Sequence, residues 1–442
     1  MYAKKTRGFL AGVAALFALS LSAPLAYADA LSTDVPLGIL EAIDLTLRNN
    51  PEILSLRQEA AKAMAFRLQA EGASLPEVAL SAYVDAQKEN QTSDGTTRRD
   101  NRVARLTLQQ TVYSGGRNAA LRRQSGQVKS IADLSLAAAE NRAVGEVFAR
   151  FYNGLLQESR VETEKAGVAT SELHLREVTR MSELGLSNRL EVIRASHQLA
   201  TNRANLSSAE GALEAAQISL MNYMGIPPEE RRQITGQLHA IEVSGSRAGS
   251  LAEAMKNRPD RGVLQSQIEY QENQIEIERS ATRPKVSLGA SAGYLDPYRG
   301  GDYGDDTWRA ELSISVPIFD RNVTRAGVMR ALAVIEQDRI SLVQKDLDIK
   351  SGVETAWAEL ESSNGHLEST ARALELAEES LRLAGVGFQE GVTPQLDLLD
   401  AQSSLTASRL EYQRSLYNNM LAAVALKVTE GNIIDWVGEL SF

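Results

Sequence analysis

Two aspartates near the C-terminal end of the chain have a spacing that could do electrostatic work. Asp397 and Asp400 lie three positions apart in a segment that reads as helix, so both carboxylates fall on one helix face. Facing a water-filled path, such a pair would attract cations and disfavour anions. Alternatively, they are acids of a first helical turn, where the helix dipole favours negative charge. The two interpretations are compatible.

No other grouping of residues favours catalysis or metal binding. Ser114-Gly115-Gly116 lacks the lysine of a phosphate loop and reads as a strand-to-helix turn. The histidines form no i,i+4 pair and no HExxH motif, so each is better explained as a solvated or wall residue than as a ligand: His174, His197, His239 and His366. The sequence therefore predicts a protein that is not an enzyme and holds no metal or cofactor.

The composition narrows the class of protein. The 442 residues carry 47 basic and 57 acidic side chains, and the net charge of −10 argues against a nucleic-acid binder. Hydrophobic residues make up 43%, which is enough for a folded protein and too few for a helical membrane protein. Because there is no cysteine, disulfides, thiolate metal sites and a lipid-modified N-terminal cysteine are excluded.

The N-terminus has the three parts of an export signal. A basic start at residues 4–7 precedes an apolar run at 9–21, which is shorter than the roughly 20 residues that span a bilayer. Small residues then offer cleavage after Ala28 or Ala30. Removal of the signal takes three positive charges with it and leaves a mature charge of −13.

The mature chain contains the same unit twice. Residues 190–195 match 396–401 in chemical type at an offset of 206 positions, and the offset is 208 near Pro76 and Pro284. One two-residue length change therefore separates otherwise parallel halves. The predicted organisation is a signal peptide at 1–28, a first repeat at 29–225, a linker at 226–249, a second repeat at 250–432 and a tail at 433–442.

Each repeat begins with a helical stretch and a β-hairpin. The strands alternate apolar and polar residues, which gives each hairpin one apolar and one polar face. Such a hairpin suits a barrel in lipid around a wet lumen, and equally a soluble hairpin packed on a core. The expected ranges are helices at 37–72 and 251–282, hairpins at 76–113 and 284–319, and polar loops at 87–101 and 298–306.

Each repeat continues with a very long helix and a shorter returning one. Residues 118–184 and 323–390 contain no proline, and at 1.5 Å per residue a helix of about 67 residues spans roughly 100 Å. Short turns then lead into helices that run back to about Met224 and Glu430. Leucines one heptad apart give the first returning helix a coiled-coil-like seam: Leu199, Leu206, Leu213 and Leu220.

Together these features resemble the TolC family of outer-membrane channel proteins. The local matches are Asn50-Pro51-Glu52, residues 113–117, and Gly391-Val392-Thr393 running into 396–401. The resemblance implies a mainly α fold with a small β part. Duplicated coiled-coil-like helical hairpins would form a trimeric α-barrel, and four strands per chain would contribute to a shared transmembrane β-barrel.

The resemblance also implies a function and partners. The protein would be a passive homotrimeric exit duct of a tripartite efflux pump or of a type I secretion system. It would sit in outer-membrane lipid, extend into the periplasm, and meet a periplasmic adaptor (membrane fusion protein) and an inner-membrane RND or ABC transporter. The runner-up is a periplasmic adaptor-like coiled-coil binding protein, and a third candidate is a structural spacer. Neither alternative accounts for the duplicated hairpins.

Roles at the periplasmic end follow from the same resemblance. Asp397 and Asp400 match aspartates that line the entrance, where threefold symmetry would make two acidic rings. Glu191 stands in the position of a gate aspartate. Phe388 and Thr393 replace a tyrosine and an arginine that hydrogen-bond to that position in the family, so those links cannot form here. Either other contacts hold the entrance shut, or it opens more easily.

Two turns match the family's adaptor-docking tips. These are Gly185-Leu186-Ser187 and Gly391-Val392-Thr393. A purely structural role, in which the glycines end helices in the left-handed conformation, is compatible with docking.

Overall fold

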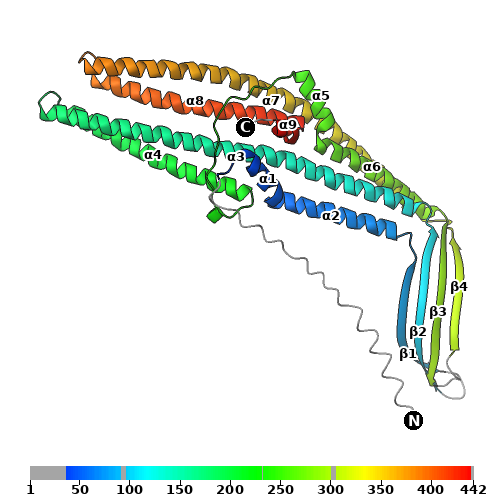
Figure 1. Ribbon diagram of the computed structural model, residues 1–442. Coiled ribbons are helices and arrows are strands. Elements are labelled where there is room, and N and C mark those ends of the chain that lie inside the picture. The colour runs from blue at the N-terminus through cyan, green and yellow to red at the C-terminus, as the bar shows by residue number, and fades with distance from the viewer. Residues whose placement is uncertain (1–35, 91–95, 231, 300–304, 440–442) are drawn as a thin grey trace, which may run out of the picture.

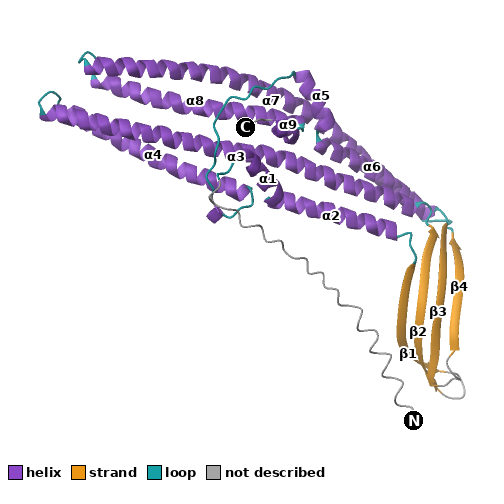
Figure 2. Ribbon diagram, viewed as in Figure 1, coloured by secondary structure: helices purple, strands orange, loops and turns teal. Residues whose placement is uncertain are grey.

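A computed structural model describes residues 36–90, 96–230, 232–299 and 305–439 (Figure 1). The expected signal peptide at 1–28 lies outside these residues. The helices form one elongated array, and the strands form a separate sheet beyond one end of it (Figure 2).

The order of elements is the same in both halves: two short helices, two strands and two long helices. The first half consists of α1 (Ile39–Asn49), α2 (Pro51–Gly72), β1 (Glu77–Asn90), β2 (Thr96–Tyr113), α3 (Arg117–Glu183) and α4 (Arg189–Tyr223). The second consists of α5 (Arg247–Asn257), α6 (Pro259–Arg279), β3 (Lys285–Arg299), β4 (Asp305–Ser315), α7 (Val323–Gln389) and α8 (Gln395–Glu430). Two 3₁₀ turns, Pro228–Glu230 and Ser280–Thr282, and the short helix α9 (Ile433–Glu439) complete the described chain.

The long helices confirm the sequence prediction, whereas the shorter helical stretches are each broken once. The breaks fall at Asn50-Pro51 and Arg258-Pro259, because proline cannot continue a helix but suits the first position of a new one. Asn50 is the N-cap of α2: its Oδ1 accepts hydrogen bonds from the first backbone N–H groups of the helix. The shorter of these bonds, from the Glu52 N–H, is 2.9 Å. Asn50 Nδ2 donates to the Tyr223 carbonyl at 2.8 Å, which fixes the break against the end of α4.

The four strands form one antiparallel sheet in the order β1-β2-β3-β4. The loops are shorter than expected, since β1 runs to Asn90 and β4 starts at Asp305, and β4 ends at Ser315, two residues before Pro317. The register sorts side chains by polarity in the part of the sheet nearer the helices, whereas farther out Tyr83, Val103 and Leu295 form an apolar row on the polar face. One row of partners is Leu80, Leu106, Ala292 and Trp308, and the next is Ser81, Arg105, Gly293 and Thr307.

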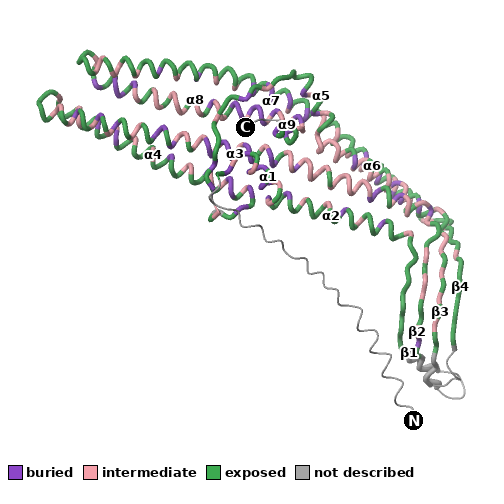
Figure 3. Tube along the Cα trace, viewed as in Figure 1, coloured by how far each residue is buried: buried purple, intermediate pink, exposed green. Residues whose placement is uncertain are grey.

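The apolar face of the sheet is uncovered in the described chain. Leu80 is 73% exposed and Trp308 is 82% exposed, and Figure 3 shows the strands as mostly exposed. A soluble hairpin would bury this face on a core, and no described helix lies over it (Figure 1). Of the two interpretations of the alternation, the arrangement favours strands whose apolar face meets lipid.

The hydrophobic core lies at the middle of the helical array rather than along its arms (Figure 3). There Phe148 of α3 and Met420 of α8 are fully buried together with Ile234 of the linker. Arg232 binds Glu41 through two hydrogen bonds of 2.7 and 2.9 Å, which ties the linker to α1. The linker therefore packs against both helical hairpins at the hydrophobic core.

The strand-to-helix turns have the same backbone in both repeats but different residues. Gly115 and Gly116 have φ of 66° and 91°, and the equivalent Arg321 and Asn322 have φ of 58° and 63°. Left-handed backbone costs an ordinary residue about 1–2 kcal/mol, and glycine escapes this cost. At Gly115 space is limiting as well, because an added Cβ would lie 2.8 Å from the Ser280 carbonyl oxygen.

Gly115→Ala is therefore expected to destabilise the protein by about 2 kcal/mol or more, through backbone strain and overlap with the neighbouring turn. The matched variant Arg321→Gly relieves strain at the equivalent position, so its stability should stay within about 1 kcal/mol of the wild type. Thermal unfolding in detergent compares the two. Equal loss in both variants would show that the conformation at Gly115 is unimportant.

Candidate functional site

The helical hairpins end in two turns at the end of the array farthest from the sheet (Figure 1). Gly185 and Gly391 have φ of 75° and 74°, so both glycines do end helices in the left-handed conformation. The N–H of the next residue closes each turn at 2.8 Å, from Leu186 to the Met181 carbonyl and from Val392 to that of Gly387.

The side chains at the two turns are presented to solvent. Leu186 is 71% exposed and Val392 is 78% exposed. Asn188 caps α4 by accepting the Glu191 N–H at 3.0 Å, and the Ser187 hydroxyl hydrogen-bonds the Glu191 carboxylate. Each turn therefore presents one apolar side chain that does not pack in the core of the described chain.

Asp397 and Asp400 are both exposed on α8, which begins directly after Pro394. Leu398 and Leu399 between them are buried, so the helix turns its carboxylates outward and its leucines inward. Asp397 lies in the first turn of the helix, where the dipole favours it. Both carboxylates remain available to ions.

The three gate positions do not contact one another as the family pattern would require. Phe388 of α7 packs its ring edge-to-face on His174 of α3, with 5.8 Å between ring centroids. Thr393 donates its N–H to the Gly387 carbonyl at 3.0 Å and so belongs to the turn. The backbone carbonyl of Glu191, not its carboxylate, accepts a hydrogen bond of 3.3 Å from Gln395 Nε2.

Of the two interpretations of His174, a solvated residue or a wall residue, the structure excludes the first. His174 is only 5% exposed, and its Nε2 lies 3.0 Å from Gln395 Nε2 at the start of α8. Burial lowers the pKa of His174, and Glu177 opposes this shift. A signal was present in the sequence, since Ser171, His174 and Val178 recur at helical spacing and all three are buried.

The other histidines fit the sequence prediction better. His197 and His239 are exposed, and His366 lies 3.1 Å from a carboxylate oxygen of Glu411 at the surface. Within the described ranges, no group of three or more His, Cys, Asp or Glu residues could hold a metal ion. No described helix is both long enough and apolar enough to cross a membrane.

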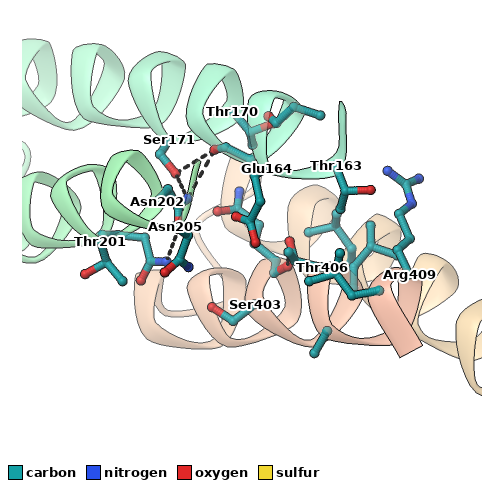
Figure 4. Close-up of a pocket in the computed structure, with 18 residues that line it drawn as sticks. Thr163, Glu164, Thr170, Ser171, Thr201, Asn202, Asn205, Ser403, Thr406 and Arg409 are labelled. Carbon is teal, nitrogen blue, oxygen red and sulfur yellow. Dashed lines mark hydrogen bonds between the residues drawn. The ribbon is translucent and has the colours of Figure 1, made fainter. Parts of the chain in front are cut away.

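Farther along the arms, a polar groove of about 470 Å³ lies between the two hairpins (Figure 4). Asn202 ties α4 to α3 there by donating to Ser171 Oγ at 2.6 Å. Glu164 is 4% exposed and extends into the groove, and burial raises its pKa while Arg160 opposes the rise. Beside the groove, Gln413 Nε2 of α8 donates a hydrogen bond of 3.3 Å to Thr163 Oγ1 of α3, so the two hairpins also contact each other there.

Comparison with known proteins identifies the architecture. The family model described as outer membrane efflux protein matches residues 42–226 and 251–432. The chain belongs to the outer membrane efflux protein family. Members of this family are channels, and this outer membrane efflux protein is an outer-membrane exit duct for efflux or type I secretion that extends into the periplasm. The adaptor-like and spacer alternatives are thereby set aside.

Two distant relatives match about nine-tenths of the chain. Protein CyaE of Bordetella pertussis is 25% identical over 90% of this chain and 84% of its own length. Alkaline protease secretion protein AprF of Pseudomonas aeruginosa is 22% identical over 89% and 84%. The fold is similar to that of the outer membrane protein VceC of Vibrio cholerae, with a TM-score of 0.76, 18% identity, and coverage of 89% and 96%.

Proposed function

We propose that this outer membrane efflux protein works as a homotrimeric ring in which each chain joins the next head to tail. The observation that carries the proposal is that the chain has two different open edges. Near the sheet the helices contact one another in the order α2, α3, α6, α7, and toward the tips in the order α4, α3, α8, α7. One edge therefore consists of β1, α2 and α4, and the other of β4 and α7.

Both edges carry apolar side chains that nothing in the described chain covers. On α7 they include five that are 51–62% exposed: Met329, Leu332, Ile340, Val343 and Leu347. On α2 three are 42–72% exposed: Leu54, Met64 and Leu68. Two unlike edges that are both apolar suit a heterologous contact, which closes into a ring when the rotation between copies is right.

The sheet supports the same conclusion. Four strands cannot close a barrel, for which about eight are the practical minimum, and unpaired strand edges in lipid cost several kcal/mol per backbone group. Three chains would supply twelve strands and pair every edge. The repeats at 29–225 and 250–432 would then alternate around the ring, with the linker at 226–249 around its waist.

We further propose that the tips carry the contacts with the rest of the export machinery. Gly185-Leu186-Ser187 and Gly391-Val392 would dock a periplasmic adaptor, and Asp397, Asp400 and Glu191 would form an acidic entrance. The duct would perform no chemistry of its own. Energy would come from an inner-membrane ABC or RND transporter, and similarity to the alkaline protease secretion protein AprF supports the secretion alternative. Crosslinking at the tip identifies which partner is present.

The variant Leu332→Asp/Ile340→Asp tests the ring. Charges on the α7 edge are expected to abolish the trimer and its conductance in planar bilayers, because unpaired carboxylates would be buried between chains. Leu332→Met/Ile340→Val keeps the surface apolar and should assemble normally. Conductance by a monodisperse monomer, or an unaffected trimer in the charged variant, would refute the proposal.

A further inference from the structure

One amide group joins the two helical hairpins at the tip. Gln395 Nε2 of α8 lies 3.0 Å from His174 Nε2 of α3 and 3.3 Å from the Glu191 carbonyl oxygen at the start of α4. Phe388 of α7 covers the imidazole from the remaining side. All four long helices therefore meet at a single buried contact, in which Gln395 is 6% and His174 is 5% exposed.

The contact requires a neutral histidine. The amide nitrogen donates both hydrogen bonds, so His174 Nε2 must accept and its proton must sit on Nδ1. On protonation, Nε2 also carries a hydrogen, and two donors face each other. Rotating the amide would restore a bond to His174 but would place an oxygen against the Glu191 carbonyl. Protonation therefore breaks one of the two links in either orientation.

The contact has no spare hydrogen bonds with which to absorb that loss. Gln395 Oε1 is buried and has no hydrogen-bond partner among the described residues. A buried amide that loses a further partner is destabilised by roughly 1–3 kcal/mol. A ring of three chains would multiply this effect, because each chain contributes one such contact.

The charged group that acts on His174 is Glu177 on the same helix, which favours the imidazolium. Burial disfavours the imidazolium more strongly, so the pKa of His174 is lowered. On α4, the Glu191 carboxylate hydrogen-bonds Ser187 and only the Glu191 backbone carbonyl joins the contact. Burial therefore keeps His174 neutral while the hairpins are together.

We propose that the bridge from Gln395 to His174 and the Glu191 carbonyl fastens the two hairpins at the periplasmic entrance, and that protonation of His174 releases it. This inference rests on the proposed function and deepens it. The bridge lies beside the two positions where the resemblance implies missing tyrosine and arginine links. At these positions Phe388 packs on His174, and the Thr393 N–H hydrogen-bonds within the turn.

The sign of the pH response follows from burial. With the hairpins together, burial depresses the pKa of His174, and separation returns it toward the ordinary value of about 6.5. The separated state therefore binds more protons. Acidification below about pH 6.5 shifts the equilibrium toward the open entrance, and neutral pH favours the fastened one.

Single-channel recording on the full-length protein in planar bilayers tests the proposal between about pH 7.5 and 5.5. All variants carry Asp397→Asn and Asp400→Asn, so that titration of the acidic rings does not mask the gate. The open probability of this background is expected to rise at least several-fold on acidification. His174→Gln should abolish the rise, while His197→Gln, an exposed histidine of α4, should retain it.

Two changes at Gln395 separate fastening from proton sensing. Gln395→Ala is expected to open the entrance at neutral pH. Gln395→Glu leaves the histidine in place and pairs its charged form with a carboxylate while the hairpins are together, so acidification should no longer open the entrance. This variant keeps the test valid if His174→Gln fails to assemble. Conducting channels whose pH response is the same with and without His174 would overturn the inference and leave the duct intact. Absence of conductance in every variant would overturn the proposed function and the inference with it.

Discussion

Substitution of Leu186 and Val392 by aspartate is expected to abolish export while the trimer still assembles and conducts. Both side chains are more than two-thirds exposed on turns whose glycines and backbone hydrogen bonds are unaffected by the change. The fold should therefore tolerate the substitution. At a docking surface, each new carboxylate would be desolvated without a partner, which costs several kcal/mol and lowers adaptor affinity by more than about 100-fold.

The measurement compares export in cells with adaptor crosslinking and with conductance of the purified protein. Leu186→Met/Val392→Ile is the matched control, because it keeps the turns apolar and should export normally. Wild-type export by the double aspartate variant would exclude the turns as docking tips, leaving only their role in ending α3 and α7.

Neutralising Asp397 and Asp400 as Asn is expected to remove most of the cation preference of the open duct. The exposed carboxylates would form two rings at the narrow end, where close charges of one sign raise the local concentration of cations. Block by multivalent cations should weaken by about tenfold or more, since it depends on several charges at once. Asparagine preserves the size of each side chain and its place on α8.

Reversal potentials in a salt gradient provide the readout. Glu59→Gln removes one exposed carboxylate of α2, far from the tip, and serves as the control. If selectivity survives the double Asn variant, the two aspartates act only as favourable charges at the start of α8.

Most of the architecture could be predicted because it depends on local pattern. The absence of proline over 118–184 fixes α3, and period-two alternation fixes the faces of the strands. Of the predicted seam, Leu199 and Leu220 are buried, whereas Leu206 and Leu213 are half-buried. Local pattern failed where it was read too coarsely, as at Asn50-Pro51, where the proline ends one helix and begins the next.

The tip was predictable in outline but not in its contacts. Gly185 and Gly391 could be predicted to end their helices, because glycine readily adopts the left-handed backbone that such a turn requires. The bridge from Gln395 to His174 joins residues 221 positions apart, and no spacing within one segment reveals such a pair. The resemblance predicted a missing tyrosine link at Phe388, whereas the contact of Gln395 with His174 is seen only in the packing of the four helices.

The concentration of the core at the waist gives the arms a mechanical property. The returning helices have 35 and 36 residues, so each arm extends about 50 Å from the region where the linker packs on the hairpins. Over that length, a tilt of only about 5° moves the tip by roughly 4 Å, about the width of a side chain. In the proposed ring, such a tilt would widen the entrance while the packing around Phe148 and Met420 stays in place.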